Sequence, residues 1–234
     1  MFRDAIDYPR NSDSAVTTVL IGGVLTLLSV LVVPTFFVLG YVVRALRSVL
    51  GGSEEPPVFD DWGDLFVDGL KAFAIGLVYS LIPVGSALAA LLVVGTATFA
   101  VGGDSPRTGI VVVLAAVGVA LLLTLVSLAL VYVLPAAVVA WVRTDRLGAA
   151  FAPDELRPLA FSRTYATGWL VAVAIGLLAN VVGGVVSATG VGGLLVPFLL
   201  FYAQVAGVYA IGTAVREIPR VADGPDAPAG RPAA

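Results

Sequence analysis

Hydrophobic and polar positions alternate along this chain in long blocks. Four runs contain no Asp, Glu, Lys or Arg, at residues 14–43, 72–103, 108–142 and 164–215. Each run exceeds the roughly 18 to 20 apolar residues that a helix needs to cross a bilayer. The last run is long enough for two crossings, because a Gly-rich stretch at 181–193 supplies a turn near its middle. The pattern predicts an all-α, polytopic membrane helix bundle with five spans, at about 16–43, 73–101, 109–142, 165–187 and 191–215.

Two prolines leave the number of spans open. Pro34 or Pro83 would add a sixth span if it marked the tip of a short hairpin rather than a kink. Against a hairpin at Pro34, only nine residues separate it from Arg44, so its return arm would leave the hydrocarbon early. We predict one transmembrane domain over 1–215, followed by a disordered cytoplasmic tail over 216–234 that is rich in Pro, Ala, Gly and Asp.

Lys and Arg fall unevenly on the two sides of this five-span arrangement. Three lie on one side, namely Arg3, Arg10 and Arg107. Ten lie on the other, namely Arg44, Arg47, Lys71, Arg143, Arg146, Arg157, Arg163, Arg216, Arg220 and Arg231. The richer side is expected to be cytoplasmic. The protein is thus predicted to be a multi-pass cell-membrane protein with its C-terminus inside and its N-terminus outside, unless a hairpin in the first span returns the N-terminus to the cytoplasm.

Composition narrows the chemistry. Hydrophobic residues make up 59% of the chain and charged ones 12%, against roughly 25% charged in a typical soluble domain. Cysteine and histidine are both absent, which excludes disulfides, lipidation on Cys and thiolate or imidazole metal sites. One Lys against twelve Arg, with a pI near 4.8, is typical of a salt-adapted archaeon with a GC-rich genome.

The segment 54–73 holds more than a third of the acidic residues. Pro56 and Pro57 interrupt any preceding helix, and Asp60 or Asp61 can then cap a new one over about 60–72. Apolar and acidic residues recur on opposite sides of it, which predicts an amphipathic helix at the membrane interface. Its expected membrane anchors are Phe59, Trp62, Phe66 and Leu70, and its expected outward face for solvent, a partner or a cation is Asp60, Asp61, Asp64 and Asp68.

A cation site is the weaker reading of these acids, because their spacing fits no calcium-binding loop. The second cytoplasmic loop, residues 143–169, repeats the layout of the first: a span ends in Arg, an amphipathic stretch follows, and an aromatic residue leads back into the bilayer.

Inside the predicted spans the costliest polar residues are Asn180 and Gln204. They are expected either to form hydrogen bonds across helices or, together with proline kinks, to line a pathway for a neutral solute. None of the four runs contains a carboxylate that could relay protons or bind sodium.

Five segments resemble one family: "YPRNSD" (8–13), "GYVVRALR" (40–47), "EEPPVFDDWGDLFVDGLKA" (54–72), "LPAAVVAWVRTDRLGAAF" (134–151) and "FYAQVAGVYAIG" (201–212). The family is domain-of-unknown-function family 4013, multi-pass membrane proteins frequent in haloarchaea. The resemblance covers nearly the whole chain and implies an all-helical protein of the cell membrane. It implies no activity and no site residues.

Three functions follow from these features. The first is a non-enzymatic membrane scaffold or interaction protein that acts through its cytoplasmic loops, with the lipid bilayer and a protein as partners and no cofactor, metal or nucleic acid. The second is a permease for a small neutral solute, using Asn180 and Gln204. The last is an interfacial enzyme built from Asp60, Asp61, Asp64, Arg143 and Asp154, which lacks an identifiable nucleophile. The sequence also allows a homo-oligomer.

Overall fold

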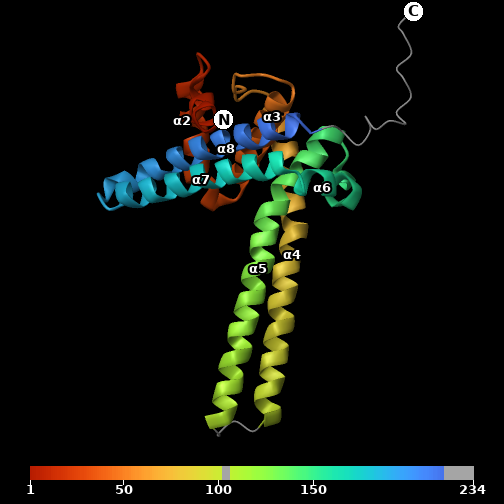
Figure 1. Ribbon diagram of the computed structural model, residues 1–234. Coiled ribbons are helices and arrows are strands. Elements are labelled where there is room, and N and C mark those ends of the chain that lie inside the picture. Colours follow the sequence, from red (N-terminus) through yellow and green to blue (C-terminus); the bar gives the residue numbers. More distant parts are fainter. Residues whose placement is uncertain (102–105, 219–234) are drawn as a thin grey trace, which may run out of the picture. The chain divides into compact units, whose positions relative to one another are not determined.

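The computed structural model describes residues 1–101 and 106–218, with the side chains of 1–96 and 109–218. Every regular element in these residues is helical, as predicted (Figure 1). The α-helices are α1 (Phe2–Asp7), α2 (Ala15–Leu27), α3 (Val33–Leu50), α4 (Trp62–Val101), α5 (Pro106–Thr144), α6 (Pro153–Ala160), α7 (Arg163–Ser187) and α8 (Val196–Arg216). Four 3-10 helices join them: η1 (Tyr8–Arg10), η2 (Leu28–Leu31), η3 (Leu147–Phe151) and η4 (Val191–Leu195).

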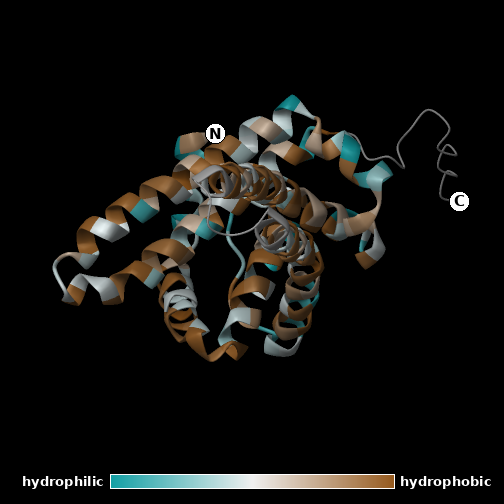
Figure 2. Ribbon diagram, turned by 90° about the horizontal axis from the view of Figure 1, so that it is seen from below, coloured by the Kyte–Doolittle hydropathy of each residue, from teal (hydrophilic) through white to brown (hydrophobic). Residues whose placement is uncertain are grey.

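In the described part of the chain, five helices are long and apolar enough to cross a membrane: α3, α4, α5, α7 and the stretch of η4 and α8. A sixth span results if the bent pair Phe2–Arg10 and Ala15–Leu31 counts as one crossing. Hydrophobic residues predominate along α7 and α8, the two helices that extend to the left in Figure 2. The chain is therefore an all-α helical protein of the membrane-spanning type, and the predicted tail lies outside the described residues except for 216–218.

The prediction of one continuous span over 16–43 is wrong. The chain breaks at Val32, which has a φ of +66°, and α3 begins at the next residue. Pro34 lies in the first turn of α3, where a backbone N–H has no partner within the helix, so its absence costs no hydrogen bond. The proline ring would, however, interrupt a helix that continued from the residues before it. At the end of the helical stretch before the break, the Ser29 hydroxyl donates to the carbonyl of Leu25 at 3.0 Å. The sequence signal at Pro34 therefore marks a helix start.

Contacts divide the chain into two compact units, where the sequence predicted one domain over 1–215. Of the described residues, the first unit comprises Met1–Phe73 and those from Ala136 to 218, and the second comprises those within Ala74–Pro135. The predicted interfacial helix over 60–72 forms the first turns of α4 and does not end there, because α4 continues without interruption through Pro83. Likewise α5 continues through Pro135.

In the first unit α8 is the central helix, packed against α7, α2 and α3 (Figure 1). Small residues allow these close approaches. A Cβ added to Gly168 of α7 would lie 2.8 Å from the carbonyl oxygen of Ala210, and one added to Gly22 of α2 would lie 2.2 Å from the ring of Phe201. The Phe201 side chain is fully buried at this contact. The core of the unit therefore depends on helices that cross at glycine.

The connection between α7 and α8 confirms the predicted Gly-rich turn. Gly190 has a φ of +75°, a conformation that glycine adopts without steric cost, and η4 follows it. A Cβ added to Gly192 would lie 2.0 Å from the carbonyl oxygen of Val186. Both positions therefore require glycine, which fixes the reversal that brings α8 back along α7.

Candidate functional site

The acidic segment, residues 54–73, is held against the first unit by backbone contacts at its start. The Tyr41 hydroxyl of α3 donates to the carbonyl of Pro57 at 2.8 Å, and the Tyr8 hydroxyl donates to the carbonyl of Glu55 at 3.2 Å. The rings of Tyr8 and Tyr41 are completely buried, so both donors are fixed in place. The loop between α3 and α4 is thus tied to the helices beneath it.

Two ion pairs fasten the beginning of α4 to α3. Arg44 pairs with Asp60 and also donates to its backbone carbonyl at 2.9 Å, while Arg47 pairs with Asp68. Lys71 lies 3.7 Å from the second oxygen of Asp68, whose side chain is only 15% exposed. The expected outward orientation of Asp68 is therefore wrong. Helix spacing placed Asp68 on the side opposite the apolar face. Spacing within one helix does not reveal that Arg47 of α3 lies close enough to pair with it.

The other acids of the segment remain on the surface. Glu54, Asp61 and Asp64 are exposed, and among the described residues none of them forms an ion pair. Asp61 precedes α4 and has a φ of +44°, a region that Asp tolerates better than most residues. Its carbonyl accepts the backbone N–H of Leu65 at 3.1 Å, so the helix begins there as predicted. Across the described residues, no three acidic side chains lie close enough to hold a metal ion.

Three of the four expected membrane anchors pack on protein. Phe59 stacks on Tyr41, with their ring centroids 4.2 Å apart. The rings of Trp62 and Phe66 both contact the ring of Phe37, with centroid distances of 5.5 and 5.6 Å. Trp62 also keeps about half of its surface exposed, as does Leu70, the fourth expected anchor. The apolar face of the helix was identified from its spacing, but it is occupied largely by the aromatic side chains of α3.

Asn180 and Gln204 lie on the surface of α7 and α8. Asn180 donates through Nδ2 to the carbonyl of Gly176, in its own helix, at 2.8 Å. Gln204 is the one exposed residue between 196 and 215, a stretch that the structure describes completely. With the residues that the structure describes, neither forms the hydrogen bond across helices that the sequence suggested, and neither lines the two cavities described next.

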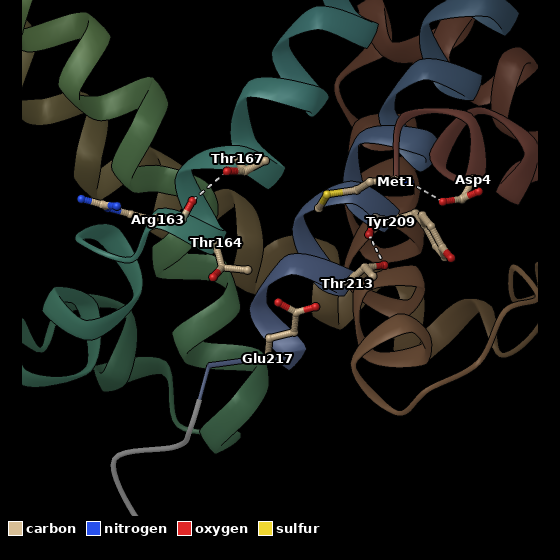
Figure 3. Close-up of a pocket in the computed structure, with 8 residues that line it drawn as sticks. All are labelled: Met1, Asp4, Arg163, Thr164, Thr167, Tyr209, Thr213 and Glu217. Carbon is tan, nitrogen blue, oxygen red and sulfur yellow. Dashed lines mark hydrogen bonds and ion pairs between the residues drawn. The ribbon is translucent and has the colours of Figure 1, made fainter.

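The first unit contains a polar cavity of about 450 Å³ between α1, the start of α7 and the end of α8 (Figure 3). Its lining comprises Met1, Asp4, Arg163, Thr164, Thr167, Tyr209, Thr213 and Glu217. The amino group of Met1 pairs with Asp4, and the Thr167 and Thr213 hydroxyls donate to carbonyls of their own helices. In Figure 3 the Arg163 guanidinium points away from the carboxylates of Asp4 and Glu217. The cavity could hold a small polar molecule, but it presents no nucleophile paired with a base.

Sequence reasoning did not find this cavity, because its residues come from three distant parts of the chain. Most of them are ordinary polar residues, and no local spacing connects them.

The second unit has a smaller cavity of about 220 Å³ between α4 and α5, lined by Gly76, Tyr79, Ser80, Pro83, Ser127, Leu130, Val131 and Leu134. The Ser80 hydroxyl donates to the Leu77 carbonyl at 2.7 Å, and no charged residue lines this cavity.

Comparison with known proteins identifies a family. A family model described as "Protein of unknown function (DUF4013)" matches residues 27–188, which include α3, α4, α5, α6 and α7. The match contains the whole acidic segment and its arginine partners on α3. No curated protein and no solved structure matches the chain significantly.

Proposed function

Because this chain belongs to the DUF4013 family of proteins of unknown function, no activity comes with its membership, and we propose from its own residues that it is a non-enzymatic membrane interaction protein. In this proposal the acidic segment lies in the cytoplasm and binds a basic protein. The C-terminus lies on the same side, in keeping with the distribution of Lys and Arg.

One observation supports this proposal most strongly. The acidic segment is fixed to α3 by ion pairs and tyrosine hydrogen bonds, while Glu54, Asp61 and Asp64 stay exposed and form no ion pair with described residues. A surface that is already ordered loses little conformational entropy when it binds a partner. Acids held in this way therefore suit recognition of a basic partner better than a disordered acidic loop would.

The alternatives have less support. Two members of the interfacial enzyme set have structural partners: Asp60 pairs with Arg44, and Arg143 donates to the carbonyls of Val215 and Ile218 at 2.5 and 2.8 Å. For a permease, Asn180 and Gln204 would have to line a pathway, whereas both lie on the surface of the first unit, outside the cavities found.

The proposal predicts a charge-dependent affinity for basic peptides. The full chain in lipid nanodiscs would be titrated with a fluorescent Arg- and Lys-rich peptide at low and high salt. An exposed ion pair is worth about 0.2–1 kcal/mol, so the double variant D61N/D64N should bind roughly twofold to thirtyfold more weakly at low salt. High salt should remove the difference.

The matched control is D154N/E217Q, which removes two exposed acids that lie outside the acidic segment and, like Asp61 and Asp64, form no ion pair with described residues. It should bind the peptide as the unmodified chain does. Unchanged binding by D61N/D64N would contradict the proposal, and so would an equal loss in the control, since that loss would reflect net charge rather than the acidic segment.

A further inference from the structure

The second cytoplasmic loop exposes apolar side chains. Phe161, between α6 and α7, is 86% exposed, and Phe151 at the end of η3 is 43% exposed. Leu147, at the start of η3, is exposed to a similar degree. In contrast, Leu159 of α6 is buried, so α6 already has an inner face that packs on the protein. Phe161 therefore takes little part in the packing of α6 on the protein.

The place of Phe161 in the chain indicates what surrounds it. The apolar span α7 begins at Arg163, two residues later. Phe161 must then lie at the level where this span leaves the hydrocarbon, because two residues cannot carry it far from the end of the helix. Aromatic rings favour this interfacial level of a bilayer.

Positive charge lies beside the exposed ring. Arg157 is four residues before Phe161, so the two side chains lie on one face at the end of α6. Arg157 and Arg163 are both exposed, and no ion pair involves them in the described part of the chain. Arg146 of the same loop differs, because it pairs with Glu155 at 3.3 Å. An unpaired guanidinium beside an apolar anchor matches a phosphate group at a lipid surface, which it can bind through two hydrogen bonds.

We propose that α6 and its flanking residues contact the membrane surface in addition to the spanning helices. This segment, Leu147–Arg163, is called the α6 anchor. Phe151 and Phe161 enter the headgroup region of the bilayer that α7 spans, and Arg157 and Arg163 bind the phosphates of anionic phospholipids. The anchor is independent of the proposed role of the acidic segment, because the two loops share no residue.

Depth in the bilayer tests the apolar part. The full chain has no cysteine, so Phe161→Cys can carry a single nitroxide spin label in nanodiscs. Collision with oxygen, which concentrates in lipid, should exceed collision with a water-soluble nickel complex, whereas a label at Glu54→Cys should show the reverse. Equal access of the nickel complex to both labels would overturn the proposal.

Lipid selection tests the charged part. Native mass spectrometry would compare the binding of phosphatidylglycerol and phosphatidylcholine to the detergent-solubilised chain. The variant R157Q/R163Q should lose preference for phosphatidylglycerol by about fivefold for each arginine. R146Q is the matched control and should keep the preference. An unchanged preference in R157Q/R163Q, or an equal loss in R146Q, would overturn the assignment of these two arginines. Loss of the preference in R157Q/R163Q alone would support it.

Discussion

Replacing Gly69 by alanine is expected to separate the start of α4 from α3 and to lower the stability of the first unit strongly. A Cβ at this position would lie 1.7 Å from the carbonyl oxygen of Phe36. The reciprocal contact is equally close, because a Cβ on Gly40 would lie 1.9 Å from the carbonyl oxygen of Leu65. Both obstacles are backbone atoms, so no side-chain rotation can relieve them. The cost should reach about 3 kcal/mol, at the upper end for overpacked cores.

The apparent midpoint of thermal unfolding in detergent micelles measures this effect, with Gly63→Ala as the matched control. Gly63 lies in the first turn of α4, and an added Cβ there meets nothing within 4 Å. Alanine favours a helix over glycine by up to about 1 kcal/mol, so the control should be neutral or slightly more stable. Equal midpoints for the two variants would contradict the close crossing of α3 and α4.

The second large effect is expected at Asp68. Its side chain is only 15% exposed, and Asp68→Asn would leave Arg47 without its main partner. The remaining acid near Arg47 is Asp145 at 3.9 Å, which is 86% exposed and therefore screened by water. Removing one member of a fully buried pair costs about 3–5 kcal/mol, and partial exposure should reduce this to roughly 2 kcal/mol. Thermal unfolding should detect the loss.

Asp60→Asn provides the comparison, because Asp60 also pairs with an arginine of α3 but is 58% exposed. Its loss should cost less than about 1 kcal/mol. A double-mutant cycle of Asp68→Asn with Arg47→Gln should give a coupling energy well above that of Asp60→Asn with Arg44→Gln. Similar coupling energies for the two pairs would mean that the partly buried Arg47–Asp68 ion pair stabilises the fold no more than the exposed pair does.

The long charge-free runs predicted α7 and α8 closely, because charged residues and a Gly-rich turn bound those helices on both sides. The predicted spans 165–187 and 191–215 compare with Arg163–Ser187 and, for η4 with α8, Val191–Arg216. The break at Val32 was missed. Proline at position 34 indicates either a kink or a helix start, and the two differ in the φ of a residue that carries no sequence signal of its own.

The acidic segment was predicted less completely than the spans. Spacing correctly separated its apolar face from its acidic face, and Pro56 and Asp61 marked where α4 could begin. The same spacing could not identify α3 as the surface that covers Phe59, Phe66 and Asp68, because those contacts join different helices. Asn180 illustrates the same limit, since a polar residue in a span predicts a hydrogen bond but not whether its own helix supplies it.

The proposed function requires the two loops to lie together on the cytoplasmic side of the membrane, and single-cysteine labelling tests this most directly. The chain contains no native cysteine, and Glu54, Gly148 and Ser187 are all exposed. In intact cells, a membrane-impermeant thiol reagent should label Ser187→Cys and leave Glu54→Cys and Gly148→Cys unlabelled until the membrane is opened. Labelling of Glu54→Cys or Gly148→Cys in intact cells would place that loop outside and contradict the account.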